Sequence, residues 1–249
     1  YHLFFILEYC SGGDLISLII EKPFLKEQVL YYSAVALSCL DFLHNESIIY
    51  RDLKLDNICL KHDGTPRLVD FGLSKVDIKL GAYTNTFCGT YVFLPPEMFL
   101  GPEYNHTLDY WQLGSLIYTM KYRSNPFIAD TDELLAKEIC NSYLKFPNDD
   151  DPLLNDIILC LMKKNPEERL GSIINKGALG VKKHAYFSTI NWMKLGSKDC
   201  HIPYIPTMKD EYGLNNFPSC SKHKASSSSN IDSVQQNIIA ANEYLFENF

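Results

Sequence analysis

The sequence lacks the features that mark several classes of protein. No apolar run approaches the roughly 18 residues that span a bilayer, and the run at residues 3–7 is short, meets Glu8 and predicts a buried strand. The eight cysteines include no CxxC pair, so their spacing excludes metal fingers and small disulfide scaffolds. Positive charge is scarce. The chain has 23 lysines and arginines but 30 acidic residues. The resulting net charge of −7 argues against nucleic acid or an anionic membrane as the main partner.

What remains is typical of a soluble globular protein. The chain of 249 residues is 46% hydrophobic and 21% charged, which suits one or two domains with a sizeable core. No signal peptide is recognised. Most cysteines are expected to be buried and reduced. We therefore expect a cytoplasmic location, with any nuclear or membrane recruitment left to regions outside this chain.

Hydrophobic periodicity predicts a fold of the α+β class that is mainly helical. Apolar residues at helical spacing predict helices at 15–20, 26–44, 108–121, 132–142 and 152–163. Asp63-Gly64 predicts a hairpin turn between short strands at 58–60 and 67–69. Two segments are expected to be irregular, a long functional loop at 76–107 and a serine-rich, disordered stretch at 222–230.

The most informative segment is Tyr-Arg-Asp-Leu-Lys-Leu-Asp-Asn at 50–57, followed by Asp-Phe-Gly beginning at Asp70. The five fixed residue types of Arg-Asp-Leu-Lys-x-x-Asn would occur by chance in about 10⁻⁴ of chains this long, assuming even residue usage. Phosphoryl transfer needs a carboxylate for the substrate hydroxyl, which suits Asp52, and a cation near the phosphoryl group, which suits Lys54. Asn57 and Asp70 would bind Mg²⁺. The alternative is a capped loop with a solvated aspartate and lysine.

These residues resemble the eukaryotic protein kinases, and their surroundings narrow the group. Tyr-Arg-Asp in place of His-Arg-Asp, Thr-Phe-Cys-Gly-Thr at 86–90, and His-Ala-Tyr-Phe at 184–187 before Ile-Asn-Trp at 190–192 resemble the AGC group, and within it the protein kinase C and protein kinase N family. The lysine of Arg-Asp-Leu-Lys is typical of serine/threonine rather than tyrosine kinases. The resemblance therefore implies ATP-dependent phosphorylation of serine or threonine in protein substrates, with Mg²⁺.

The resemblance also implies how the chain is divided. Residues 1–14 match the last small-lobe strand and the hinge, residues 15–187 the large C-terminal lobe, and residues 188–249 the C-terminal tail of AGC kinases.

Five residues would bind the nucleotide if the resemblance holds. Backbone groups of Glu8 and Cys10 would bond the adenine edge, and Asp14 would hold the ribose. Cys59 would form part of the adenine floor, with plain core packing as its alternative role. Phe217 matches the aromatic residue of the Asn-Phe-Asp motif in the tail, although proline replaces the aspartate here.

The loop at 76–107 carries the match to a regulatory phosphosite. Thr86 stands at the phosphorylated position, where an upstream kinase would act, and Arg51 and Lys75 stand where cations would bind its phosphate. The alternative is an ordinary loop threonine. Thr90 would bond the proposed base and its neighbouring lysine.

Three further residues match structural positions of the family. Glu97 would pair with Arg169, and a buried pair of this kind is costly to break on one side. Asp109 would cap the backbone of the catalytic loop.

The family's small lobe has no counterpart in the sequence. No Gly-rich phosphate loop, strand lysine or paired helix glutamate is found, and these groups clamp the β- and γ-phosphates in kinases. We therefore expect this chain alone to bind nucleotide weakly and to catalyse little, either as a fragment or as a truncated product. The alternative function is a catalytically inactive kinase that acts as a binding or regulatory module.

Overall fold

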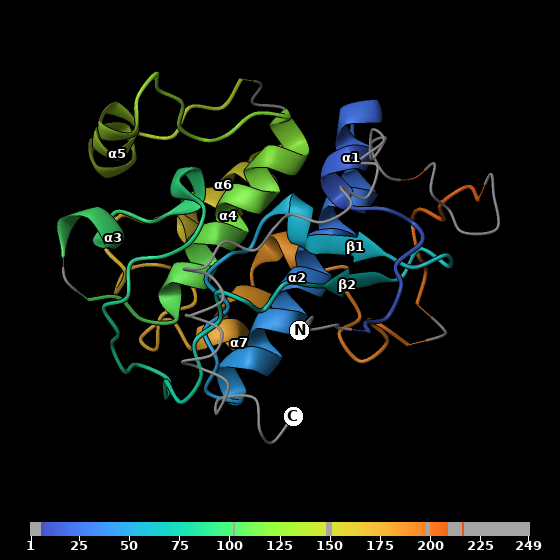
Figure 1. Ribbon diagram of the computed structural model, residues 1–249, viewed down its shortest axis with the longest axis horizontal. Coiled ribbons are helices and arrows are strands. Elements are labelled where there is room, and N and C mark those ends of the chain that lie inside the picture. The colour runs from blue at the N-terminus through green and yellow to red at the C-terminus, as the bar shows by residue number, and fades with distance from the viewer. Residues whose placement is uncertain (1–5, 102, 148–150, 198–199, 209–215, 217–249) are drawn as a thin grey trace, which may run out of the picture. The chain divides into compact units, whose positions relative to one another are not determined.

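The computed structural model describes residues 6–101, 103–147, 151–197, 200–208 and 216 (Figure 1). Within these residues the chain is mainly helical and has one two-stranded sheet. Its elements are α1 (Leu15–Glu21), α2 (Lys26–Asn45), η1 (Leu55–Asn57), β1 (Ile58–Leu60), β2 (Pro66–Leu68), η2 (Tyr91–Phe93), α3 (Glu97–Leu100), α4 (Thr107–Tyr122), α5 (Asp132–Asn141), α6 (Pro152–Leu161), α7 (Gly177–Lys182) and η3 (Ala185–Phe187). None of the described helices combines the length and the apolar character needed to cross a membrane.

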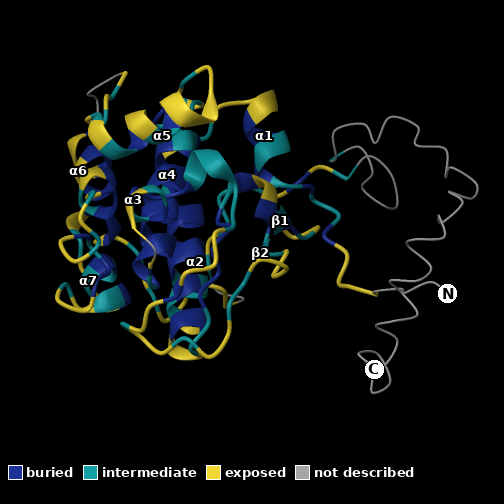
Figure 2. Cartoon of the chain, turned by 60° about the vertical axis from the view of Figure 1, so that its left-hand side comes forward, coloured by how far each residue is buried: buried dark blue, intermediate teal, exposed yellow. Residues whose placement is uncertain are grey.

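The core forms around α4, which packs against α2 on one side and α6 on another. Almost all of α4 is buried, whereas α2 has one exposed edge (Figure 2). The ring of Trp111 on α4 stacks on Phe127 at a centroid distance of 6.2 Å, and both are at most 5% exposed. The sequence patterns predicted these helices to within one or two residues at each end. Helix α4 is therefore a rigid support for the loops that pack against it.

Local signals explain where several elements begin. The Asp14 carboxylate accepts a hydrogen bond from the Ser17 N–H at 2.7 Å and caps α1. Asp151 caps α6 in the same way, and Pro152 occupies the first helical position, where its missing N–H costs nothing. The predicted hairpin is confirmed: Ile58 pairs with Leu68 across an antiparallel ladder.

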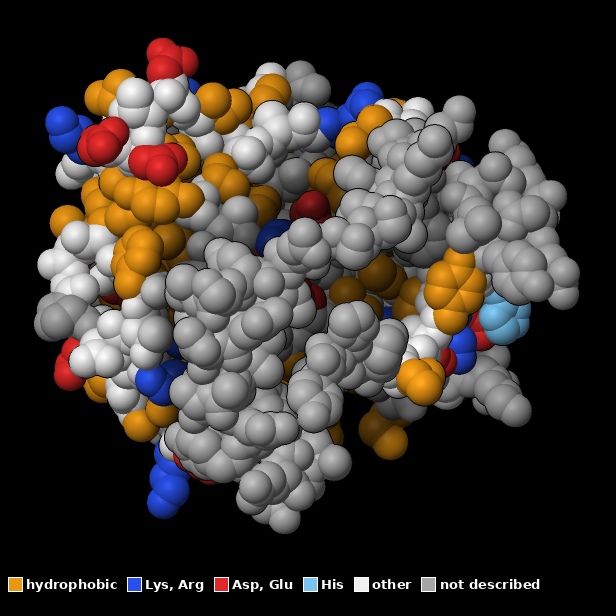
Figure 3. Space-filling view, in the orientation of Figure 1, with side chains coloured by type: hydrophobic (Ala, Val, Ile, Leu, Met, Phe, Trp, Pro, Cys, Tyr) orange, Lys and Arg blue, Asp and Glu red, His pale blue; other side chains and the backbone are white. Residues whose placement is uncertain are grey.

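A second, smaller hydrophobic cluster anchors the long loop. It consists of Leu94, Met98, Tyr104 and Leu108, all buried. Thr84 and Tyr104 exchange two backbone hydrogen bonds of 2.8 Å, which tie the start of the loop to this cluster. Hydrophobic side chains also gather on the face over α3 and α5 (Figure 3). The backbone at Thr84 is thus held beside Tyr104, near the end of the long loop.

Two expectations from the sequence are wrong. Ile6 and Leu7, the described part of the run at 3–7, are 98% and 82% exposed and belong to no strand, so the expected burial is wrong there; residues 3–5 lie outside the described residues. Of the seven described cysteines all are free, but only Cys10 is buried and the other six are half-buried. The predictions for Phe217, for the stretch at 222–230 and for most of the tail lie outside the described residues.

Candidate active site

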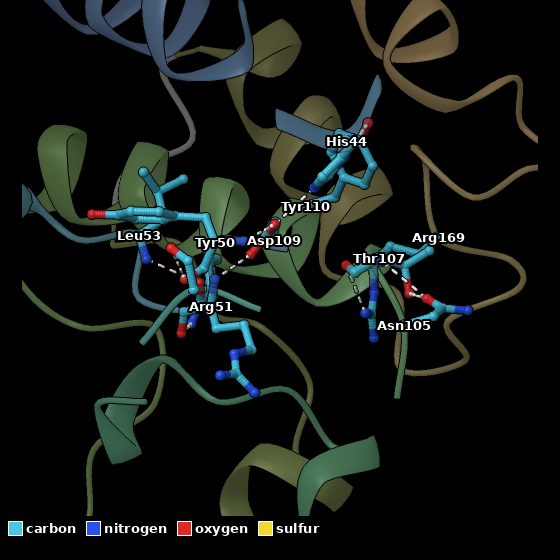
Figure 4. Close-up of polar contacts among 11 residues, drawn as sticks. His44, Tyr50, Arg51, Leu53, Asn105, Thr107, Asp109, Tyr110 and Arg169 are labelled. Carbon is cyan, nitrogen blue, oxygen red and sulfur yellow. Dashed lines mark hydrogen bonds and ion pairs between the residues drawn. The ribbon is translucent and has the colours of Figure 1, made fainter. Parts of the chain in front are cut away.

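Side chains of α4 hold the backbone of the loop at 50–53. The Asp109 carboxylate accepts hydrogen bonds from the N–H groups of Tyr50 and Arg51 at 2.9 and 2.8 Å (Figure 4). One turn further, Gln112 accepts from the Leu53 N–H at 3.0 Å and donates to the Arg51 carbonyl at 2.9 Å. The Asp109 carboxylate therefore accepts the predicted capping bonds, and Gln112 makes two more hydrogen bonds to the same loop.

These bonds stabilise an unusual backbone. Arg51 has a φ of 72°, in the left-handed region that is unfavourable for residues with a side chain. Asp109 is 0% exposed, so its bonds to the loop are shielded from water. Fixed backbone bonds on both sides of Arg51 keep it in this conformation and thereby set the direction of the next residue, Asp52.

Asp52 lies at the centre of a close group of polar side chains. Its Oδ1 accepts a hydrogen bond from the Thr90 hydroxyl at 2.7 Å. Its Oδ2 accepts from the Asn57 amide at 2.9 Å and pairs with the Lys54 ammonium at 2.9 Å. Lys54 also donates to the Thr90 hydroxyl at 2.8 Å. The structure thus brings together four of the predicted catalytic residues and orients both oxygens of the one carboxylate.

Asn57 and Asp70 come from neighbouring segments, because the Val69 N–H donates to the Asn57 carbonyl at 2.9 Å. The Asn57 amide nitrogen faces Asp52, which determines how the amide oxygen lies. The exposed Asp70 carboxylate accepts one hydrogen bond, from the Gly72 N–H at 3.1 Å, and has further lone pairs. Both residues can supply hard oxygen ligands, so this donor set fits Mg²⁺.

Two of the predicted nucleotide residues are adjacent. Asp14 and Cys59 form an isolated antiparallel bridge, and burial raises the pKa of the Cys59 thiol to about 11. Next to them, the Asn216 amide donates to the Ser11 carbonyl at 3.1 Å, and a Cβ on Gly13 would lie 2.0 Å from the Asn216 carbonyl oxygen. The residue before Phe217 therefore packs directly on the segment around Gly13.

Two more of the predicted nucleotide residues, Cys10 and Glu8, lie just before this segment in the chain. The Cys10 carbonyl accepts a bond from the Gly13 N–H at 3.4 Å. The Glu8 carboxylate pairs with Lys61 at 3.0 Å and Arg67 at 3.4 Å, and the hydrogen bond from Lys61 lowers its pKa. These side-chain pairs connect residue 8 to the β1–β2 hairpin.

Thr86 is exposed and has cationic groups nearby. The Lys75 ammonium, predicted to bind a phosphate on this residue, donates to its hydroxyl at 3.0 Å. Arg51 instead donates to the Leu73 carbonyl and, at 2.8 Å, to the Tyr104 hydroxyl, which itself donates to the Thr86 carbonyl at 2.6 Å. Arg51 therefore reaches Thr86 through Tyr104 rather than directly.

The predicted pair of Glu97 and Arg169 also forms. The two terminal guanidinium nitrogens of Arg169, Nη1 and Nη2, donate to the carboxylate at 2.6 and 2.8 Å, and the arginine is fully buried. The same guanidinium donates to the carbonyls of Thr107 and Lys163 at 3.0 Å each. This pair joins the start of α3 to the segment before α7 and to the first residue of α4.

Sequence reasoning missed three residues that support the site. Gln112 lies three positions after Asp109 on α4, a spacing that places both on one helix face and could have indicated its role. Tyr104 had no such signal. His44, at the end of α2, bonds Asp109 Oδ2 at 2.7 Å, the same oxygen that accepts the Tyr50 N–H.

A buried histidine beside this network predicts acid sensitivity. Burial and the neighbouring His44 lower the pKa of His106 to about 4, and His106 is 2% exposed. Its unfolded pKa is about 6.5, so between these values the unfolded chain binds more protons and stability falls as pH falls. We expect the wild type to lose about 2 kcal/mol more stability than His106→Gln between pH 7 and pH 5.

Urea unfolding of both proteins at the two pH values measures this difference. His184→Gln is a suitable control, because His184 contacts Asp156 at the surface rather than the His44 network. Parallel pH curves for the wild type and His106→Gln would contradict the prediction.

Comparison of the sequence with known proteins identifies the family of this chain. The family model described as "Protein kinase domain" matches residues 1–187. The chain belongs to the protein kinase family. Serine/threonine-protein kinase N2 from Danio rerio is 36% identical over 216 residues, covering 87% of this chain and 22% of that protein. Protein kinase C eta type from Homo sapiens is 37% identical over 216 residues, covering 86% of this chain and 32% of that protein.

The predicted relationship to AGC kinases of the protein kinase C and protein kinase N family is therefore confirmed. The kinase chain spans only about a fifth to a third of the length of these relatives.

Proposed function

We propose that this chain forms the large lobe and tail of a serine/threonine kinase that transfers a phosphoryl group from ATP to protein hydroxyls. Residues 15–187 would be the lobe, residues 1–14 the hinge segment and residues 188–249 the tail. The name of the relative from Danio rerio and the lysine of the Arg-Asp-Leu-Lys motif support serine and threonine as acceptors. Partners would be protein substrates and an upstream kinase.

The bonding around Asp52 is the observation that carries this proposal. One carboxylate oxygen faces the Thr90 hydroxyl, and the other faces Asn57 and Lys54. A carboxylate held in this way accepts the proton of a serine or threonine hydroxyl and aims its oxygen at the phosphoryl group. Lys54 would balance the charge that develops on that group. Three neighbours therefore orient one base and leave it little rotational freedom.

Asn57 and Asp70 would hold the metal. Mg²⁺, when bound, neutralises phosphate charge during transfer. Both residues supply oxygens in fixed positions. Asp52 orients the Asn57 amide, and the Gly72 N–H orients the Asp70 carboxylate. Asp14, Cys59 and the backbone at 8–10 would hold the nucleoside, as the bridge between Asp14 and Cys59 supports, and Phe217 of the tail would approach it.

A peptide assay tests the proposed function. The protein expressed from its complete gene is mixed with labelled ATP, Mg²⁺ and four peptides that differ only in having serine, threonine, tyrosine or alanine at the acceptor position. We expect label on the serine and threonine peptides alone. A protein that labels none of them, and whose melting temperature MgATP does not change, would be a binding module instead.

Thr86→Ala is expected to lower the phosphorylation rate about 10- to 100-fold. A phosphate on Thr86 would form charge-assisted hydrogen bonds with Lys75, which already contacts its hydroxyl, and with nearby Arg51. One such bond contributes about 1.5–3 kcal/mol to the ordered loop. The rate is measured on the serine peptide, and mass spectrometry determines the phosphate on residue 86.

Tyr83→Phe is the matched control, because Tyr83 lies in the same loop and is 53% exposed. It should leave the rate unchanged. A wild-type protein that is fully active with no phosphate on Thr86 would contradict the role proposed for this residue.

A further inference from the structure

A carboxylate, a thiol and an imidazole meet on the outer side of α6, in a place that the proposed phosphoryl transfer does not use. Asp156 and Cys160 are four residues apart on α6, so their side chains lie on one face of the helix. His184, just before η3, points its Nε2 at the Asp156 carboxylate, 3.0 Å away. One ligand atom from each of the three residues lies within 4.8 Å of the others.

These ligand types suit zinc. Zinc in proteins is bound by cysteine thiolate, histidine nitrogen and carboxylate oxygen, and two ligands of a tetrahedral site lie about 3.3–3.6 Å apart. The histidine and aspartate atoms, 3.0 Å apart, are already near this separation, and the Cys160 sulfur, within 4.8 Å of both, would have to move closer by a change of side-chain rotamer. Thiolate and carboxylate together carry two negative charges, which match the charge of Zn²⁺. Among the described residues no other group of three such ligands is this close.

We propose that Asp156, Cys160 and His184 bind a zinc ion, with water at the fourth position. Asp156 is exposed, while Cys160 and His184 are half-buried, so an ion can enter from solvent and still be held against the protein. The site connects α6 to the segment between α7 and η3, two parts of the chain that already pack together. Zinc binding would therefore cross-link α6 to the segment between α7 and η3.

The protons can be followed through the binding step. In the metal-free chain the His184 Nδ1 accepts a bond from the Tyr186 N–H at 3.2 Å, which leaves the ring proton on Nε2, facing Asp156. Zinc takes the place of this proton between Nε2 and the carboxylate, and the ring proton moves to Nδ1. The Tyr186 N–H then loses its acceptor. The Cys160 thiol releases one proton to solvent as the zinc–sulfur bond forms.

Cobalt binding gives a direct test, because Co²⁺ bound to a thiolate has a charge-transfer absorption band in the near ultraviolet. The 249-residue chain is treated with a chelator, freed of it and titrated with Co²⁺. We expect the band to saturate at one equivalent and to disappear when Zn²⁺ is added. Cys160→Ser should abolish the band, and Asp156→Asn should weaken Co²⁺ binding by about tenfold or more.

Cys140→Ser is the matched control, since Cys140 is also free and half-buried but lies on α5. It should keep the band. Circular dichroism establishes that each variant is folded, and Zn²⁺ should raise the melting temperature of the wild type and of Cys140→Ser but not of Cys160→Ser. Absence of the band in the wild type, its survival in Cys160→Ser, or its loss in Cys140→Ser would overturn the proposal.

Discussion

Asp52→Asn is expected to lower the rate of phosphoryl transfer about 10²- to 10⁴-fold, the usual contribution of a positioned base. The substitution keeps the size of the side chain but removes its charge and one acceptor. At present one oxygen accepts from Thr90 and the other from Asn57 and Lys54. The new amide nitrogen cannot face Asn57 and Lys54, which can only donate here, so it must turn to Thr90, whose hydroxyl then accepts a bond instead of donating one. The variant therefore loses both the base and the orientation of its neighbours.

The rate is measured on the serine peptide with the protein expressed from its complete gene. Asp56→Asn serves as the control, because Asp56 lies four residues further along the same loop and is exposed. It removes the same charge without touching the Asp52 group. A rate for Asp52→Asn within threefold of the wild type, or an equal loss in both variants, would show that Asp52 is not the base.

Local patterns predicted the parts of the fold whose causes are local. The helix at 26–44 follows from apolar spacing and the hairpin from Asp63-Gly64, and both are present within a residue or two. Asp151 and Pro152 likewise begin α6 as their sequence indicates. In each case the determining residues lie within a few positions of the element that they specify.

Long-range contacts could not be derived in this way. Tyr104 links Arg51 to Thr86 only because the loop returns beside Thr84, 20 positions earlier in the chain. The burial expected of Ile6 and Leu7 is absent for the same reason, since a strand depends on a partner that its own residues do not encode. Asp109 and the pair of Glu97 and Arg169 were found through family resemblance, not through spacing.

Glu97→Gln is expected to lower the free energy of unfolding by about 3–5 kcal/mol, because it leaves the charge of Arg169 buried and unpaired. Arg169 is 0% exposed and the Glu97 side chain 9% exposed, so water cannot replace the lost carboxylate. The glutamine nitrogen would also face a guanidinium N–H. Urea unfolding at pH 7 measures the loss. The control Glu167→Gln removes an exposed carboxylate near the arginine and should change stability by less than about 0.5 kcal/mol.

A double variant distinguishes two contributions to the free energy of unfolding: the penalty for leaving the Arg169 charge unpaired and the net stabilisation by the ion pair. Glu97→Leu with Arg169→Met replaces both charges by apolar groups, which in buried sites is often neutral or stabilising. Here recovery should be incomplete, because the carbonyls of Thr107 and Lys163 also lose the guanidinium as their donor. We therefore expect the double variant to fall between the wild type and Glu97→Gln. A double variant less stable than Glu97→Gln would mean that the pair itself, rather than the avoidance of an isolated charge, stabilises this junction of α3 and α4.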